Sequence, residues 1–293
     1  MAEIRSKKFT GERPLFASSD LTISGCTFEN GESPLKECER LDIASSQFKW
    51  KYPLWYCRRV KVKDSVFYEG ARAGMWYTDD IDISDSVIYA PKSFRRSSNI
   101  NLNTVKILKA DETLWTCDGV KIRNVSAKGD YFGMNCRRVE ASDLILDGNY
   151  AFDGAEKVII RNSKLLTKDA FWNCKNVEVY DSYISGEYLG WNSKDLTLVN
   201  CTIESHQGMC YIDNLKLVNC ILINTDLAFE YSTVEADITS SVDSVFNPSG
   251  GTIKAERIGE LIIEKDRIDP KRTVIICHDI GAEKDRPEWP EVK

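Results

Sequence analysis

The chain has 293 residues, of which 42% are hydrophobic and 29% charged, so it carries enough apolar material for a continuous core. Its formal net charge is -6 and basic residues form no long run, so electrostatics do not favour binding to nucleic acid or an anionic membrane. The start lacks the apolar core of a signal peptide, and no apolar run is long enough to span a bilayer. We therefore expect a cytoplasmic protein that binds neither nucleic acid nor membrane.

One repeat runs through most of the chain. A β-branched residue or Leu, taken as position zero of each unit, recurs at intervals of 19 to 21 residues. A period this constant is typical of a solenoid, in which each unit forms one turn. The position-zero residues are Leu21, Leu41, Val60, Ile81, Ile100, Val120, Val139, Val158, Val177, Leu196, Leu215, Val234 and Ile253.

The N-terminal residues already carry part of the repeat. Pro14-Leu15-Phe16 with Ser18 matches Pro34-Leu35-Lys36 with Cys38. We expect an incomplete turn before Leu21, preceded by about a dozen residues outside the repeat.

Within each unit, positions zero, two and seven are apolar and position five is small. Alternation with a period of two indicates strands with one buried face, and each three-residue step marks a bend. Such a face is buried when identical turns stack about 4.8 Å apart. The pattern predicts an all-β fold, a single-stranded parallel β-helix of about 13 turns. A leucine-rich repeat is the rival, but its first column requires Leu and its period is about 20 to 29 residues.

The ten cysteines follow the repeat and not a disulfide or metal-ligand spacing. They share their columns with Ser, Thr and Ala, which predicts small packing residues with no bound metal or cofactor. Three residues before position zero lie Cys38, Cys57, Cys117, Cys136 and Cys174, and five residues after it lie Cys26, Cys201 and Cys220.

The pattern loosens after Val234. Leu261–Glu264 and Thr273–Cys277 are predicted strands joined across Asp269-Pro270-Lys271, so we expect a hairpin cap near 261–278. We therefore predict a single domain over 1–280 and a disordered, charged tail over 281–293.

Several phrases resemble an uncharacterised bacterial family of domain-of-unknown-function proteins. The resemblance covers essentially the whole chain and implies a right-handed, pectin-lyase-like β-helix, with no established activity or catalytic residues to carry over. The phrases are Phe-Thr-Gly-Glu-Arg-Pro-Leu-Phe-Ala (9–17), Pro-Leu-Trp-Tyr (53–56), Ala-Arg-Ala-Gly-Met-Trp-Tyr (71–77), Gly-Glu-Tyr-Leu-Gly-Trp-Asn (186–192), Gln-Gly-Met-Cys-Tyr (207–211) and Leu-Ala-Phe-Glu-Tyr-Ser-Thr (227–233).

Tryptophans recur in the column five residues before position zero. The neighbouring column holds apolar residues and no charge, so alternation predicts that the tryptophan column faces outward. Aromatic faces edged by carboxylates and amides are typical of a sugar-binding surface. The predicted binding residues are Trp55, Trp76, Arg95, Trp115, Tyr131, Trp172, Glu187, Tyr188 and Trp191.

Glycoside cleavage needs two carboxylates about 5 to 9.5 Å apart. Asp153 lies among the aromatic residues, with Asp130 and Asp169 a turn away along the same arc, so these three are the candidate catalytic acids of a glycoside hydrolase or a lyase-like enzyme. His206 has no evident Ser or Cys partner and is expected to be a surface residue.

Two classes of function remain open. One is a carbohydrate-binding or carbohydrate-processing β-helix whose partner is an oligosaccharide. The other is a non-catalytic interaction scaffold in which the tryptophan face forms a homo-oligomer interface.

Overall fold

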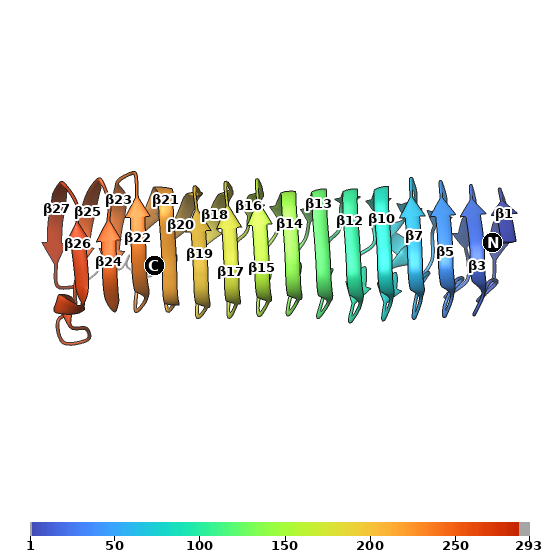
Figure 1. Cartoon of the computed structure of the whole chain (residues 1–293), viewed down its shortest axis with the longest axis horizontal. Helices are drawn as coiled ribbons and strands as arrows, with labels where there is room; N and C mark the ends of the chain where they lie inside the picture. The colour runs from blue at the N-terminus through green and yellow to red at the C-terminus, as the bar shows by residue number, and fades with distance from the viewer. Residues whose placement is uncertain (1, 287–293) are drawn as a thin grey trace, which may run out of the picture. The chain divides into compact units, whose positions relative to one another are not determined.

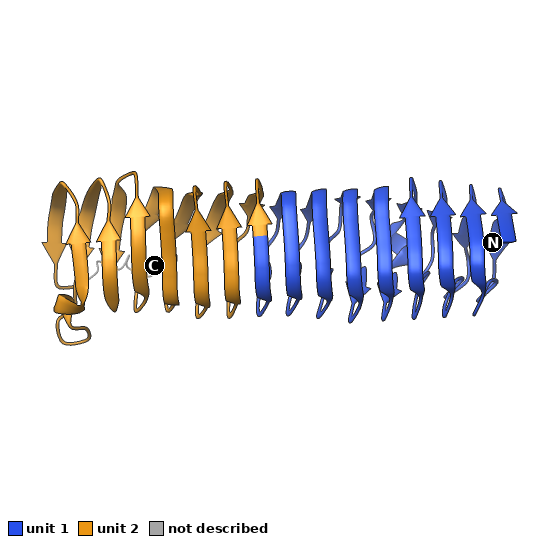
Figure 2. Cartoon of the chain, in the orientation of Figure 1, with its two compact units in different colours: residues 1–159 blue, residues 160–293 orange. Residues whose placement is uncertain are grey.

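The computed structural model describes residues 2–286, and the chain divides into two compact units, Met1–Ile159 and Ile160–Lys293 (Figure 2). Both units are built from parallel β-strands, as Figure 1 shows. In residues 2–286 the only helical segments are two short 3-10 turns, η1 (Glu69–Ala71) and η2 (Pro270–Arg272). The predicted all-β class is confirmed.

Unit 1 alternates strands with bends. Its strands are β1 (Ala2–Arg5), β2 (Lys8–Thr10), β3 (Ser19–Ser24), β4 (Thr27–Glu29), β5 (Glu39–Ala44), β6 (Gln47–Phe48), β7 (Arg58–Lys63), β8 (Val66–Phe67), β9 (Met75–Trp76), β10 (Asp79–Ile88), β11 (Phe94–Arg95), β12 (Ser98–Ile107), β13 (Asp118–Lys128) and β14 (Arg137–Asp147). In sequence, β15 (Glu156–Arg161) contains the boundary of the unit.

Unit 2 repeats the same design. Its strands are β16 (Lys164–Leu166), β17 (Lys175–Tyr180), β18 (Tyr183–Glu187), β19 (Lys194–Val199), β20 (Thr202–His206), β21 (Asp213–Asp226), β22 (Thr233–Ile238), β23 (Val242–Phe246), β24 (Gly250–Lys254), β25 (Arg257–Ile262), β26 (Thr273–Ile276) and β27 (Asp279–Lys284).

Strand register confirms most of the repeat. Within unit 1 the hydrogen-bonded ladder pairs Ala2, Leu21, Leu41, Val60, Ile81, Ile100, Val120 and Val139 in succession. Within unit 2 it pairs Val177, Leu196, Leu215, Val234, Gly251 and Thr273. The solenoid therefore has about 15 turns, not the predicted 13.

The two additional turns lie at the ends of the repeat. Ala2 opens a complete first turn, so the expected incomplete turn was wrong. Near the other end, Val234 pairs with Gly251 and not with Ile253, because the turn between them is two residues shorter than the period predicts. Position zero of this turn is Gly251, so the β-branched residue or Leu that marks the column in other turns is absent here.

The predicted C-terminal hairpin is absent. β26 pairs in parallel with β24, and β25 pairs in parallel with β23 and β27, so the two supposed hairpin strands belong to different sheets of the solenoid. β27 also extends to Lys284, beyond the expected domain end at 280. The rest of the predicted tail, 287–293, lies outside the described residues. The right hand of the coil and the single-domain organisation stay predictions.

Inward columns form continuous stacks. Phe48 is fully buried, with its ring centroid 5.1 Å from that of Phe28 and 4.6 Å from that of Phe67, at interplanar angles of 10° or less. These distances follow the spacing of neighbouring strands, because each turn presents the same residue at the same place. The core of each turn is thus completed by the turns beside it.

The bends are made by residues in the left-handed backbone region. The position four residues after zero has φ near 50° in turn after turn. This conformation is costly for most L-residues, and Asn and Asp tolerate it best because their short side chains can bond locally to the backbone. Examples are Ser45, Asp64, Asp85, Asn124, Asp143, Asp181 and Asn200.

The small columns also bind the backbone at these bends. The Ser65 hydroxyl donates to Lys63 O at 2.8 Å and accepts the N–H of Ser46 in the preceding turn at 3.0 Å. In the other small column, Cys57 Sγ lies 3.0 Å from Leu35 O and Ser97 Oγ lies 2.8 Å from Met75 O. The Ser and Cys side chains of these columns therefore satisfy buried carbonyls as well as fitting a small space.

We predict that Phe48→Ala lowers the free energy of unfolding by about 3–5 kcal/mol, because it leaves a cavity between two stacked rings. Urea denaturation followed by circular dichroism measures the change. Ile145→Ala is the matched control, since Ile145 is 53% exposed and its truncation should change stability little. Equal losses in the two variants would contradict the inward stack.

A second prediction concerns thiol reactivity. None of the ten cysteines forms a disulfide, and nine are buried, whereas Cys277 is half-buried. Burial raises the pKa of Cys38 to about 11 and that of Cys210 to about 12, which keeps the reactive thiolate scarce. A disulfide reagent should label Cys277 first in the native protein and all ten thiols in denaturant. Rapid labelling of several thiols before unfolding would contradict this packing.

Candidate functional site

The tryptophans of unit 1 form a packed layer along the wall of the solenoid. Trp55 stacks on Trp76 with centroids 5.5 Å apart and an interplanar angle of 9°. The Trp55 indole N–H donates to Ala73 O, and that of Trp76 donates to Lys92 O at 2.7 Å. Both side chains are half-buried, so the predicted outward column lies flat against the backbone.

Arg95 continues this row in place of a ring. Its guanidinium carbon lies 4.5 Å from the Trp76 centroid and 4.9 Å from the Trp115 centroid, so the planar cation fills the gap between two indoles. Glu112 accepts a hydrogen bond from Arg95 Nη2 at 3.0 Å and pairs with Lys92 Nζ at 2.8 Å. The faces of the Trp76 and Trp115 rings and the charges of Arg95 and Glu112 are therefore engaged within the protein, so few of these groups can contact a ligand.

The other predicted residues of unit 1 lie farther along the same arc. Tyr131 stacks on Tyr150 at 4.9 Å. The Asp130 carboxylate accepts the backbone N–H of Asn149 at 2.7 Å, which is a structural bond between neighbouring turns. Asp153 is half-buried in the following turn. The catalytic roles of Asp130 and Asp153 stay predictions, although one oxygen of Asp130 already serves the backbone.

Unit 2 brings the remaining predicted aromatic residues together. The Trp172 indole N–H donates to Tyr188 O at 2.8 Å, and Trp172 lies 6.0 Å from Trp191. Tyr188 meets Trp191 at 5.9 Å and 85°, and Trp191 meets Tyr211 at 4.5 Å. In place of the parallel Trp55–Trp76 stack, Trp172 and Tyr211 are tilted by 32° and 40° to Trp191, and only Tyr188 meets it edge-on.

Two acidic residues predicted in unit 2 differ in exposure. Glu187 is half-buried and pairs with Lys168 at 2.9 Å. Asp169 is only 2% exposed, so its expected place on the open face of the arc was wrong. The residue follows the bend, where a backbone φ of 59° turns the chain at Asp169 and alternation no longer predicts the direction of the side chain.

An open groove of about 700 Å³ lies beside Tyr188 in unit 2. Its wall combines one aromatic ring with acidic, basic and amide groups from several turns. The lining residues are Tyr188, His206, Gln207, Asp226, Leu227, Asp243, Ser244, Glu260, Ile262 and Lys284. This mixture of ring, hydrogen-bond donors and acceptors is the chemistry that the sequence predicted, but it gathers at a different place.

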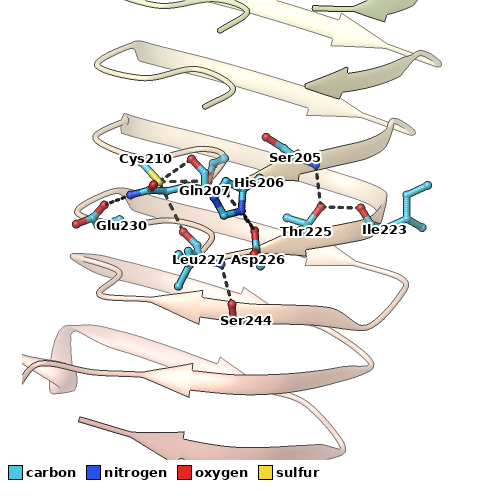
Figure 3. Close-up of polar contacts among 11 residues, drawn as sticks. Ser205, His206, Gln207, Cys210, Ile223, Thr225, Asp226, Leu227, Glu230 and Ser244 are labelled. Carbon is cyan, nitrogen blue, oxygen red and sulfur yellow. Dashed lines mark hydrogen bonds and ion pairs between the residues drawn. The ribbon is translucent and has the colours of Figure 1, made fainter. Parts of the chain in front are cut away.

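Polar contacts join several lining residues of the groove, and Figure 3 shows those of His206, Gln207 and Asp226. His206 Nδ1 and Asp226 Oδ1 are 2.6 Å apart, and the same oxygen lies 3.4 Å from the backbone N of Gln207. At the groove rim, Lys284 Nζ pairs with Glu260 at 2.8 Å. His206 is exposed, as expected, and its partner is a carboxylate, not a Ser or Cys side chain.

Behind the groove, Gln207 contacts a buried acid. Its side-chain amide donates to Glu230 Oε2 at 3.1 Å, and the Tyr211 hydroxyl lies 3.5 Å from Glu230 Oε1. Glu230 is 8% exposed, and burial raises the pKa of its carboxyl above the ordinary value. A buried carboxyl with a raised pKa therefore lies one side chain away from the groove.

Sequence reasoning missed Asp226, Glu230, Asp243 and Glu260. They lie where the repeat loosens: the pairing of β20 with β21 shifts register between Glu204 and His206. The sequence signal that could have located these residues was the phrase at 227–233. It resembles the family, but its residues do not fit the columns of the repeat. In residues 2–286 no three His, Cys, Asp or Glu side chains are grouped to hold a metal ion. No helix in that range is long and apolar enough to cross a bilayer.

Comparison with known families supports the resemblance. A family model described as "Protein of unknown function (DUF3737)" matches residues 2–276. The chain belongs to this family. No curated protein matches it in sequence.

Three solved structures show a distant likeness to the chain. PfbA, a surface adhesin of Streptococcus pneumoniae, is 11% identical with a TM-score of 0.28, over 97% of this chain and 74% of that one. The periplasmic alginate epimerase AlgG is 9% identical with a TM-score of 0.24, over 96% and 74%. QnrB1, a plasmid-mediated fluoroquinolone resistance protein, is 15% identical with a TM-score of 0.22, over 74% and 91%. We draw no conclusion from these scores.

The Glu230 environment predicts a pH effect on stability. The pKa of the Glu230 carboxyl is higher in the folded protein than in the unfolded chain. Between these two pKa values the folded protein therefore binds more protons than the unfolded chain. The free energy of unfolding should consequently fall as pH rises from the ordinary Glu pKa through the raised one. Glu230→Gln should remove this part of the slope, as urea denaturation from about pH 4 to 8 measures. Glu235→Gln, at an exposed position, is the control and should keep the slope. A slope that Glu230→Gln leaves unchanged would contradict the raised pKa.

Proposed function

We propose that the protein binds carbohydrate in the groove of unit 2. The observation that carries the proposal is the position of the Tyr188 ring in one open groove with the His206–Asp226 pair. Sugars present apolar C–H faces and hydroxyl edges, so a site for them combines an aromatic surface with hydrogen-bonding groups.

The polar groups of the groove match the hydroxyl edges of a sugar. Asp226, Asp243 and Glu260 supply acceptors, and His206 and Gln207 supply ring nitrogens and an amide. The groups come from successive turns, so an extended oligosaccharide fits better than a single small sugar. The open form of the groove agrees with a chain that enters and leaves along the surface.

Tyr188 is held in place by its neighbours. Its backbone N–H donates to His206 O at 3.0 Å, and its ring contacts those of Trp191 and His206 at steep angles. Fixing the ring before binding reduces the entropy that a ligand must remove. The carbohydrate hypothesis formed on the tryptophan column is therefore retained, with the binding surface moved to this groove.

The proposal concerns carbohydrate binding and does not include catalysis. A glycoside hydrolase or lyase-like activity through Asp130, Asp153 and Asp169 stays a prediction, as do the cytoplasmic location and the bacterial source. The alternative of a homo-oligomer through the tryptophan face is weakened, because none of Trp55, Trp76, Trp115, Trp172 and Trp191 is among the exposed large hydrophobic residues.

A glycan array followed by titration calorimetry tests the proposal. We expect Tyr188→Ala and Asp226→Asn each to weaken binding of an array hit at least about fivefold, the effect of losing roughly 1 kcal/mol at a central contact. Tyr131→Ala is the matched control because Tyr131 occupies the same column of the repeat in unit 1, and it should bind normally.

Two outcomes would overturn the proposal. If Tyr131→Ala weakens binding and Tyr188→Ala does not, the ligand lies on the aromatic row of unit 1. If the folded wild-type protein binds no glycan on the array or in titration, the groove is not a carbohydrate site.

A further inference from the structure

The charged side chains that line the groove of unit 2 are mostly acidic. They comprise three carboxylates, those of Asp226, Asp243 and Glu260, one ammonium, that of Lys284, and the imidazole of His206. Lys284 Nζ lies 2.8 Å from Glu260 Oε1, so this cation is paired with one of the three carboxylates. Within residues 2–286 no Lys or Arg forms an ion pair with either aspartate of the groove.

Asp226 and Asp243 occupy equivalent positions of neighbouring turns. The Leu227 N–H donates to Ser244 Oγ at 2.7 Å (Figure 3), and the residues that follow these two form a parallel bridge. Each aspartate comes one residue earlier, so two like charges lie on adjacent turns. Like charges directly opposed on neighbouring strands are destabilising. A cation bound at this pair would remove that cost.

Both aspartates have oxygens available to a ligand. The contacts of Asp226 with His206 Nδ1 and with the backbone N of Gln207 are both made by Oδ1, which leaves Oδ2 for another donor. Asp243 is exposed, and its carboxylate has no hydrogen-bond or ion-pair partner in the part of the chain that the structure describes. The pair therefore presents acceptors from two turns to a single donor group.

An ammonium group suits this pair better than a metal ion. It has three N–H donors, so it can bond to both aspartates and still donate once to water or to the ligand itself. Hydrogen bonds between an ammonium and a carboxylate are charge-assisted and stronger than those of neutral groups. A metal ion would need more ligands, and the described residues hold no group of three His, Cys, Asp or Glu side chains.

The aspartate pair lies along the groove from Tyr188. Glu187, the residue before Tyr188, pairs in register with His206, and His206 pairs with Asp226, so Asp243 lies three turns beyond Tyr188. With turns about 4.8 Å apart, this separation is roughly 14 Å along the solenoid. The contact with the ring and the contact with the aspartates therefore fall on different units of an extended oligosaccharide.

We propose that the ligand of the groove is an oligosaccharide with free amino groups, one of which binds as an ammonium between Asp226 and Asp243. The inference rests on the proposed carbohydrate function and adds the class of sugar. A uronic acid would bring a further carboxylate into an acidic groove and be repelled. A neutral sugar would leave the charges of the aspartate pair uncompensated.

Titration calorimetry with two matched tetrasaccharides tests the proposal. The probes are the β-1,4-linked tetramer of glucosamine and its fully N-acetylated form, which share the same backbone but differ in charge. At about pH 6.5, where free amino groups are mostly protonated, the wild type should bind the amino form at least about tenfold more tightly. This preference should shrink as salt is added, because salt screens the attraction between ammonium and carboxylate.

Asp243→Asn isolates the ammonium contact. It should lower the affinity for the amino form about tenfold and leave that for the N-acetylated form unchanged. The variant should fold normally, since it removes one of two opposed like charges. Glu235→Gln, at an exposed position of β22, makes the same change in net charge elsewhere in unit 2 and should keep the preference.

The possible outcomes separate this inference from the proposed function. If the wild type binds both tetrasaccharides equally, or if Asp243→Asn keeps the preference, the ammonium contact is overturned while carbohydrate binding stands. If the wild type binds no glycan in any form, the proposed function and this inference fail together. If 1,4-diaminobutane binds as tightly as the glucosamine tetramer, the aspartates form a general cation site and the assignment to an amino sugar is overturned.

Discussion

The structure depends on backbone hydrogen bonding between turns that repeat the same register. Because each turn stacks on the next about 4.8 Å away, a residue type chosen at one position meets its own kind above and below. This explains why phenylalanines form a continuous stack, why Ser and Cys alternate in the columns that bind carbonyls, and why the bends fall on residues that accept a positive φ. A single local rule, applied turn after turn, produces the core.

The same rule explains why the tryptophans are a layer and not a binding surface. Equal spacing brings Trp55 and Trp76 face to face, and Arg95 preserves the layer because a guanidinium is planar and stacks on rings. A ligand surface needs ring faces that the protein leaves unused. At Tyr188 the repeat is broken, so the ring leaves the flat layer: it meets Trp191 at 85° beside the shifted register of β20 and β21, and Lys168 Nζ lies 5.8 Å from its centroid.

The predictability of each part follows from this regularity. The strands, columns and buried positions could be read from the sequence because each was repeated many times, as position zero was from Leu21 to Val234. The first and last turns were missed because Ala2 and Gly251 do not mark their columns, and the hairpin was inferred from strand propensity without register. The aromatic and acidic chemistry was predicted, but the groove was not, since Asp226 and Glu230 occupy turns that depart from the pattern.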